Sequence, residues 1–184
     1  METEETNLPG VMLIKPRVFG DARGYFVETW SGPRYQQAGI EHSFVQDNLS
    51  RSARGVLRGL HFQNPNPQGK LVRVSAGEVF DVAVDVRRGS PHFGKWTGVL
   101  LTSESQHQLW VPPGFAHGFC VVSEFALFEY KCTEVYQPES DWGLRWDDPA
   151  VGIDWPINDP KVSEKDAAQP LLSEIPQERL PVFP

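Results

Sequence analysis

Hydrophobic and polar residues alternate along most of this chain, in short runs rich in β-branched and aromatic residues that Gly, Pro, Asn and Asp interrupt. A period of two with such interruptions is typical of β-strands joined by turns. The pattern predicts ten strands, at residues 11–15, 25–29, 44–50, 56–62, 71–75, 78–86, 96–102, 107–111, 116–122 and 126–135. Many short antiparallel strands favour a sandwich or a barrel, because both arrangements hide strand edges.

Helical signals are scarce. One short helix is predicted at residues 32–39, with Pro33 near its start and Gly39 as its C-cap. Past Asp147 the sequence "DDPAVGIDWPINDP" is dense in proline and aspartate, and it predicts an ordered loop laid over the domain. The chain has 184 residues and no internal repeat, so a single domain is expected.

Charged residues inside the predicted strands are candidates for a site. In the strand at 56–62, strict alternation places Arg58 and His61 on opposite faces, but a β-bulge at Gly59 would bring both to the same face. Lys70 falls on the side of the valines of the next strand, either in water at a frayed strand end or as a cation in a cavity. Asp81 lies within the strand at 78–86 and must be paired or face a cavity, because unpaired burial of a carboxylate is costly.

Composition and charge argue against several classes of protein. The net charge of −7 and the pI near 5.2 disfavour a nucleic-acid-binding protein. No apolar run approaches the ~18 residues of a membrane helix, so no membrane partner is expected. The acidic start "METEETNLPGV" does not resemble a secretory signal, which favours a cytoplasmic location. Cys120 and Cys132 lie in apolar contexts and are expected to be buried thiols.

The histidines test for a metal site. The stretch "PPGFAHGF" places His117 in the Pro-x-Gly-x-x-His spacing of the second cupin metal motif, but "LHFQ" offers one histidine, His61, where the first motif requires two and an acid. A first-row metal would lack its usual ligands, so no metal is expected. His42, His92 and His107 lie in turns or at strand ends and are expected to be surface or structural residues.

An ordered set of segments goes further than any one motif. The set comprises "FGDARGYFVETW", "FVQDNLSRSARGVLRGLHFQ", "PQGKLVRVSAGEVFDVAVDVRRGS", "PPGFAHGF", "YKCTEVYQPESDWGLRWDDPAVGIDWP" and "SEKD". Together, over roughly residues 9–170, they resemble the dTDP-4-dehydrorhamnose 3,5-epimerase family. The resemblance implies an all-β, cupin-like jelly roll with a few short peripheral helices and no metal or other cofactor. It also implies one domain over residues 1–184, with a C-terminal segment packed over the barrel, and a homodimer in which the N-terminal strands of one subunit reach the other's site.

The resemblance also implies a reaction, the conversion of dTDP-4-dehydro-6-deoxy-D-glucose to dTDP-4-dehydro-L-rhamnose in the making of activated rhamnose. Inversion at C3 and C5, which flank the C4 ketone, requires a base on one side of the sugar and an acid on the other. By resemblance His61 is the base, Asp166 holds its other ring nitrogen, Lys70 faces the enolate oxygen and Tyr130 is the acid. From the residues alone, Asp166 would be a surface aspartate at a helix start and Tyr130 a core aromatic on a strand.

Further residues are implied to bind the substrate. They are Arg23, Phe26, Glu28, Gln46, Asn48, Arg58, His117, Tyr136, Asp141 and Lys165. The two arginines suit a diphosphate, and the aromatic rings of Phe26 and Tyr136 are candidates to stack on thymine or to be core. Three alternatives remain: an epimerase of a related sugar that inverts only C3 or only C5, a sugar-nucleotide-binding protein without catalysis, and a metal-dependent cupin oxygenase.

Overall fold

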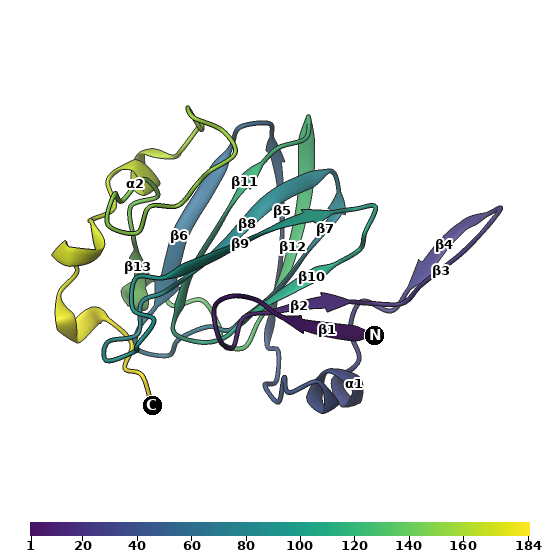
Figure 1. Cartoon of the computed structure of the whole chain (residues 1–184), viewed down its shortest axis with the longest axis horizontal. Coiled ribbons are helices and arrows are strands. Elements are labelled where there is room, and N and C mark those ends of the chain that lie inside the picture. The colour runs from purple at the N-terminus through teal and green to yellow at the C-terminus, as the bar shows by residue number, and fades with distance from the viewer.

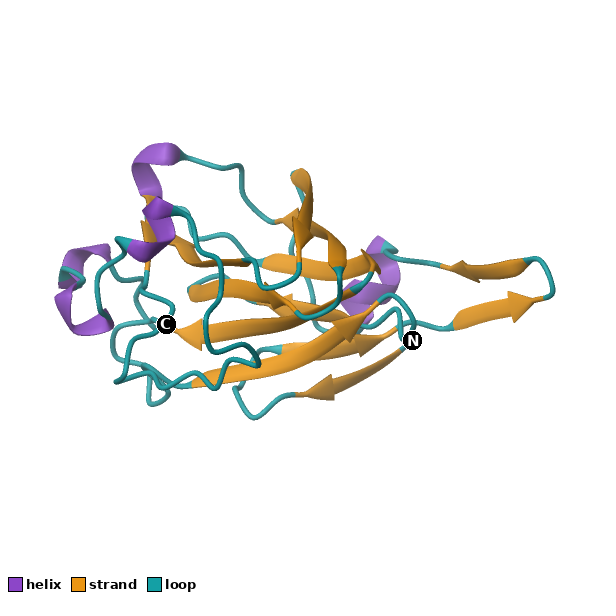
Figure 2. Ribbon diagram, turned by 90° about the horizontal axis from the view of Figure 1, so that it is seen from above, coloured by secondary structure: helices purple, strands orange, loops and turns teal.

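Two antiparallel β-sheets packed face to face form the body of the computed structural model, which describes residues 1–184 (Figures 1 and 2). The six-stranded sheet comprises, in spatial order, β1 (Glu2–Glu5), β2 (Met12–Lys15), β10 (Gln108–Val111), β7 (Lys70–Ala76), β12 (Phe125–Cys132) and β5 (Gln46–Ala53). The five-stranded sheet comprises β13 (Asp141–Gly143), β6 (Leu57–Gln63), β11 (Phe115–Val121), β8 (Glu78–Asp85) and β9 (Trp96–Thr102). The predicted all-β, cupin-like fold is confirmed.

The ten predicted strands are all present, with ends shifted by at most three residues. Three further strands, β1, β13 and β3 (Val18–Asp21), were not predicted. β1 reads "ETEE" and is fully exposed, so it carries no hydrophobic alternation and exists only because it pairs with β2 at the sheet edge. Pairing between neighbouring backbones does not depend on side-chain pattern, and this explains the omission.

The main hydrophobic core lies between the two sheets. It is built from inward-facing residues of both, including Val72, Val74, Phe119 and Phe128. A second core lies on the other face of the five-stranded sheet, where the C-terminal region contributes Leu144, Val151, Trp155, Leu172, Ile175 and Leu180. The stretch at residues 147–160 contains no helix or strand, as predicted, and the residues beyond it form α2 (Glu164–Ala167) and the short 3₁₀ helices Leu172–Glu174 and Gln177–Arg179, which were not predicted by position.

A smaller cluster covers part of the outer face of the six-stranded sheet. Tyr35 from α1 (Gly32–Gln37) and Ile40 pack on Ile14, Leu71 and Trp110 there. The helix ends close to the predicted position, and Gly39 adopts φ +91°, as expected of a C-terminal glycine. Both cysteines are buried thiols as predicted, and burial raises the pKa of Cys120 to about 11.

The bulge expected at Gly59 is present. β11 pairs His117 with His61 but Phe119 with Arg58, so β6 has one more residue than β11 over this stretch. Gly59 has φ +120°, and a Cβ there would lie 2.6 Å from Cα of Gly118, so a side chain would not fit. The extra residue turns both Arg58 and His61 to the inner face, as predicted.

One element leaves the body altogether. The hairpin of β3 and β4 (Gly24–Val27) projects away from both sheets (Figures 1 and 2). It carries exposed aromatic residues, of which Phe26 is 69% exposed. Separately, none of the helices is long and apolar enough to cross a membrane.

Candidate active site

A hollow of about 570 Å³ opens between the two sheets at one end of the core. It is lined by Ser50, Val56, Leu57, Arg58, His61, Lys70, His117, Gly118, Phe119, Phe128, Tyr130, Lys161, Val162, Ser163, Lys165 and Asp166. A second hollow of about 250 Å³ adjoins it and shares His61, Lys70, Tyr130 and Lys165 with it. Charged and aromatic side chains from both sheets therefore face one continuous space.

His61 is held by Asp166, although the two residues are 105 positions apart in the sequence. Nε2 of His61 lies 2.7 Å from Oδ1 of Asp166, and the Gly59 amide donates to Oδ2 at 3.3 Å. Asp166 occupies the first turn of α2, where the Ser163 hydroxyl accepts from its amide as the helix N-cap. Burial acts to raise the pKa of Asp166, but the hydrogen bond and charge of His61 and the amide of Gly59 outweigh it and lower the pKa.

His117 is held in the same way by a different carboxylate. Its Nε2 lies 3.0 and 3.1 Å from the two carboxylate oxygens of Asp81, which is fully buried on β8. His117 and His61 are cross-strand partners of β11 and β6, so their rings stand side by side on the inner face. Asp81 is thus paired, one of the two outcomes expected for it.

Lys70 and Tyr130 reach the hollow from the facing, six-stranded sheet. Lys70 is half-buried, and burial lowers its pKa, while Cys132, Asp141 and Asp81 attract its charge and oppose that shift. The Lys70 side chain lines the hollow, so of the two alternatives for Lys70 the structure shows the cation in a cavity and not the frayed strand end in water. Burial, followed by the nearby Cys132, raises the pKa of Tyr130, so this phenol keeps its proton at neutral pH.

The adjoining hollow is lined by five of the predicted substrate-binding residues, of which Lys165 also lines the first hollow. Gln46, Asn48, Tyr136, Asp141 and Lys165 line it. The Tyr136 hydroxyl donates to Asp141 at 3.0 Å, and the ammonium of Lys165 forms an ion pair with the same carboxylate. These side chains hold one another at the mouth of the site, and each offers polar atoms to a ligand.

Three predicted residues lie elsewhere in the chain. Arg23 lies at the turn of the projecting hairpin, where it is paired with Asp21. Phe26 is exposed on β4, and Glu28 follows that strand and is paired with Arg34. None of the three lines the hollow of its own chain.

Sequence reasoning named Asp166 but neither Ser163, which caps its helix, nor Ser50. Ser163 and Asp166 form the S-x-x-D pattern of a helix start, and this pattern marks the position of α2. The hydroxyl oxygen of Ser50 is fully buried beside the hollow without a hydrogen-bond partner, and no sequence pattern marked it. His42, His92 and His107 do not line the hollow, and no cluster of three or more His, Cys, Asp or Glu side chains is arranged to hold a metal ion.

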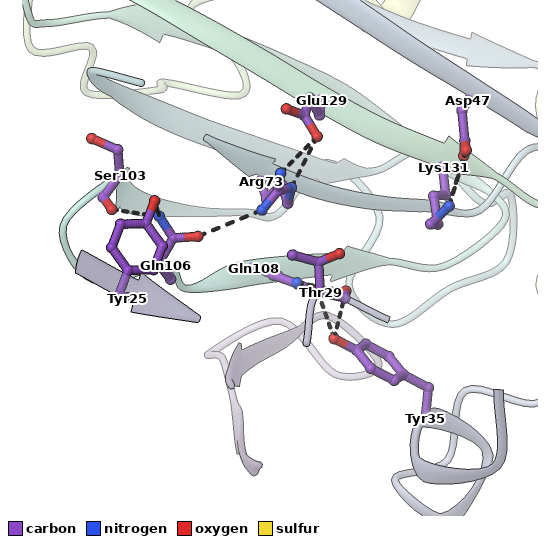
Figure 3. Close-up of polar contacts among 10 residues, drawn as sticks. All are labelled: Tyr25, Thr29, Tyr35, Asp47, Arg73, Ser103, Gln106, Gln108, Glu129 and Lys131. Carbon is purple, nitrogen blue, oxygen red and sulfur yellow. Dashed lines mark hydrogen bonds and ion pairs between the residues drawn. The ribbon is translucent and has the colours of Figure 1, made fainter. Parts of the chain in front are cut away.

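A separate hollow of about 370 Å³ lies on the outer face of the six-stranded sheet (Figure 3). Several polar residues in and beside this hollow are bonded to one another. The Arg73 guanidinium donates to Glu129 at 2.9 Å and Lys131 to Asp47 at 3.0 Å, while the Gln106 amide donates to the Tyr25 hydroxyl at 3.1 Å (Figure 3). The four charged side chains that line this hollow are thus paired with one another, so it is a weaker candidate for catalysis than the interior hollow.

Comparisons with known proteins agree with the resemblance. The family model described as dTDP-4-dehydrorhamnose 3,5-epimerase matches residues 5–174. The enzyme of that name from Methanothermobacter thermautotrophicus is 53% identical over 175 residues, which cover 94% of this chain and 95% of the relative. A solved structure of dTDP-6-deoxy-D-glucose-3,5-epimerase from Legionella pneumophila, in complex with dTDP-4-keto-L-rhamnose, superposes with a TM-score of 0.97 at 51% identity, covering 100% of this chain and 98% of that one.

A more distant neighbour shows that the fold also hosts narrower activities. The structure of a 3'-monoepimerase from Streptomyces bikiniensis in complex with dTDP-quinovose has a TM-score of 0.88 at 32% identity and covers 96% of this chain and 91% of its own. The family match, in contrast, extends over nearly the whole length at high identity. The chain therefore belongs to the dTDP-4-dehydrorhamnose 3,5-epimerase family.

Proposed function

We propose that this chain inverts C3 and C5 of dTDP-4-dehydro-6-deoxy-D-glucose to give dTDP-4-dehydro-L-rhamnose. One observation carries the proposal: a carboxylate-held imidazole lies on one sheet, while a protonated phenol and an ammonium group lie on the sheet that faces it. A sugar between the sheets would have a base on one side and an acid on the other. The reaction moves only protons, so it requires neither a metal nor a redox cofactor.

His61 removes the proton. Asp166 accepts from Nε2–H of His61, which leaves Nδ1, free of hydrogen bonds within the chain, as the base. The C–H bond at C3 or C5 breaks, its proton goes to Nδ1, and its electron pair forms an enolate whose charge lies on the C4 oxygen. The ionised Asp166 stabilises the resulting imidazolium.

Tyr130 and Lys70 complete the inversion. The ammonium of Lys70 faces the enolate oxygen, where positive charge lowers the energy of the intermediate. The Tyr130 hydroxyl donates its proton to the carbon from the opposite face, after which the phenolate takes a proton from solvent and His61 releases one. Because the phenol is protonated at neutral pH, it is ready to act as the acid.

The nucleotide occupies the mouth of the site. Arg58 and Lys165 supply local positive charge for a diphosphate on an otherwise acidic protein. Gln46 and Asn48 offer hydrogen bonds, and the half-exposed ring of Tyr136 offers a face for thymine. His117 and Asp141 contribute further polar contacts.

One experiment tests this function against its alternatives. The protein is incubated with dTDP-4-dehydro-6-deoxy-D-glucose in D₂O, deuterium at C3 and C5 is followed by NMR, and bound metal is measured alongside. Label at both carbons with formation of the L-sugar is expected. Label and inversion at only one carbon would identify a monoepimerase. Binding of the nucleotide sugar without any label would identify a non-catalytic protein. Loss of activity on chelation, restored by one metal, would identify a metalloenzyme.

We also propose that two copies of the chain form a dimer in which each completes the other's site. The hairpin of β3 and β4 projects from the body of the chain (Figure 1). It exposes Tyr25 and Phe26, and Arg23 at its turn does not line the hollow of its own chain. The six-stranded sheet leaves Leu49 65% exposed on its outer face. A second copy that covered these apolar surfaces would bring Arg23, Phe26 and Glu28 to the neighbouring site.

Mixed dimers test this arrangement. Arg23→Glu and His61→Ala variants, each strongly impaired alone, are co-expressed with different tags and the heterodimer is purified. One site of the heterodimer then has both native residues, so about half of the wild-type activity should return. A His61→Ala and Tyr130→Phe heterodimer is the control, because both residues belong to the same chain's hollow and neither site is restored. A fully active monomer in sedimentation would refute the dimer.

A further inference from the structure

We propose that Gln108 is a positioning residue for the reaction: together with Tyr35 it fixes the root of the projecting hairpin, so that the hairpin reaches the partner's site in one orientation. The inference rests on the proposed dimer and deepens it. It gives a task to a buried hydrogen-bond network on the outer face of the six-stranded sheet, outside the interior hollow (Figure 3).

The root of the hairpin, residues 28–30, follows β4. The side-chain amide of Gln108 donates to the carbonyl oxygen of Thr29 at 2.8 Å (Figure 3). The Tyr35 hydroxyl donates to Oε1 of Gln108 at 2.9 Å and also lies 3.0 Å from the Thr29 carbonyl oxygen. Burial raises the pKa of Tyr35 to about 12, so the hydroxyl keeps its proton for this contact. Two almost fully buried side chains therefore hold one backbone carbonyl of the root.

A second contact holds the hairpin farther from its root. Gln106, two residues before Gln108, is also buried, and its Nε2 lies 3.1 Å from the Tyr25 hydroxyl and 2.6 Å from the Ser103 carbonyl oxygen (Figure 3). Tyr25 lies on β4, four residues before Thr29. A hairpin held at its root alone could swing about that point, whereas contacts at two points along the chain restrict its direction.

The direction of the hairpin contributes little to the packing of its own chain. Its aromatic residues, including Phe19 and Phe26, stay exposed, and holding an exposed segment in one orientation costs conformational entropy. That order has a use in the proposed dimer, where the hairpin brings Arg23 and Phe26 to the neighbouring site. A segment that is already oriented loses less entropy on binding, so the network should strengthen nucleotide binding in the partner's site.

Kinetics of the homodimer give the size of the effect. Gln108→Met keeps the length of the side chain and removes its hydrogen bonds. The ratio kcat/KM should fall about tenfold, mainly through KM, because a misplaced hairpin binds the nucleotide poorly. Ser90→Ala is the matched control: its hydroxyl is bonded to Asp85 of the five-stranded sheet and lines neither hollow of the site, so kcat and KM should not change.

Mixed dimers separate orientation of the hairpin from a general contribution to folding. In one heterodimer, Gln108→Met and His61→Ala are on the same chain beside a wild-type chain, so the single working hollow receives the altered hairpin and should show the full loss. In the other, the two substitutions are on different chains. The working hollow then receives a native hairpin, and its activity should match that of the heterodimer of wild type with His61→Ala.

The same two arrangements with Arg23→Glu in place of Gln108→Met distinguish failure of the inference from failure of the proposed dimer. If Arg23→Glu impairs the neighbouring hollow but Gln108→Met impairs its own hollow, both hollows equally or neither, the positioning role is refuted. If Arg23→Glu itself does not act on the neighbouring hollow, the proposed dimer is wrong. Tyr35→Phe removes only a hydroxyl and provides the same comparison, with a smaller loss, if Gln108→Met does not fold.

Discussion

Two histidines of the five-stranded sheet, His61 on β6 and His117 on β11, are cross-strand neighbours, and each is paired with an aspartate. In both pairs Nε2 of the histidine lies within hydrogen-bond distance of the carboxylate. Their surroundings differ. Asp166 lies at a helix N-terminus, where His61 and the Gly59 amide overcome the effect of burial and lower its pKa. Asp81 lies fully buried in the middle of a strand, where burial prevails and raises its pKa.

The two pairs consist of the same residue types, yet their aspartates differ in how readily they ionise. The lowered pKa of Asp166 favours the ionised carboxylate beside His61, whereas the raised pKa of Asp81 makes ionisation of the carboxyl beside His117 less favourable. Environments that push paired titratable groups apart in this way commonly mark the acid and base assignments of an active site.

The largest effect is expected from the loss of the proposed base. His61→Ala should lower epimerisation about 10⁴-fold and abolish deuterium entry at both C3 and C5, because one base serves both carbons. The matched control is His92→Ala, a half-buried histidine that does not line the hollow. Near-normal exchange at either carbon in D₂O, measured by NMR, would remove His61 from this role.

The same substitution should have unequal consequences in the two pairs. Asp166→Asn can donate from its amide to Nε2 of His61 and so move the proton to Nδ1, which would then no longer act as a base. Activity should fall about 10³-fold, a larger loss than for Asp81→Asn, because His117 is not the proposed base. Steady-state kinetics of the two variants, with ¹⁵N shifts of both histidines, would check this, and equal losses would mean that the two pairs are not functionally distinct.

Mutation should distinguish the role of the acid on the facing sheet from the role of the base. Tyr130→Phe should lower net epimerisation about 10²-fold while solvent deuterium still enters the recovered substrate with retained configuration, because His61 exchanges its proton with water. A coupled assay for the product and NMR of the recovered sugar would report the two quantities. If Tyr130→Phe epimerises at the wild-type rate, Tyr136 is the first alternative donor, and Tyr136→Phe tests it.

The bulge that places both histidines on one face can be tested through stability. Gly59→Ala should lower the free energy of unfolding by roughly 1–3 kcal/mol, because its Cβ would collide with Gly118 and the carbonyl of His117. Gly55→Ala also has a positive φ, but its Cβ would meet nothing within 4 Å, so only the smaller backbone cost remains. Urea unfolding of both variants measures the difference, and equal losses would show that the close approach to β11 is unimportant.

The smallest effect is the pH dependence of stability, and its sign should differ between the pairs. Because the pKa of Asp166 is lowered in the folded protein, the free energy of unfolding of wild type should rise relative to Asp166→Asn as pH increases from that lowered pKa to the unfolded-state pKa of ~3.9. The same stabilisation should be lost as pH falls through this range. The raised pKa of Asp81 should make wild type lose stability relative to Asp81→Asn as pH rises above ~3.9. Thermal unfolding from pH 3 to 8 would check this, and parallel curves for the two variants would contradict the comparison.

Much of the fold could be predicted from the sequence, since the alternation of hydrophobic residues located ten strands and the glycine within "RGLHF" indicated the bulge. Family motifs pointed to His61, Tyr130 and Lys70, which lie on strands that the pattern had already located. Asp166 illustrates the limit of local reasoning, because nothing near it in the sequence indicates that α2 will cover a strand a hundred residues earlier.

Strand positions and the family follow from the sequence by itself, because side-chain alternation and motif order are local properties of the chain. Only the tertiary structure decides which carboxylate contacts which histidine. It also decides that the hairpin of β3 and β4 lies away from the hollow of its own chain. The physical reason is that a pKa depends on burial and on charges brought together through space. The two pairs therefore acquire different chemistry only when the sheets close around Asp81 and α2 carries Asp166 to His61.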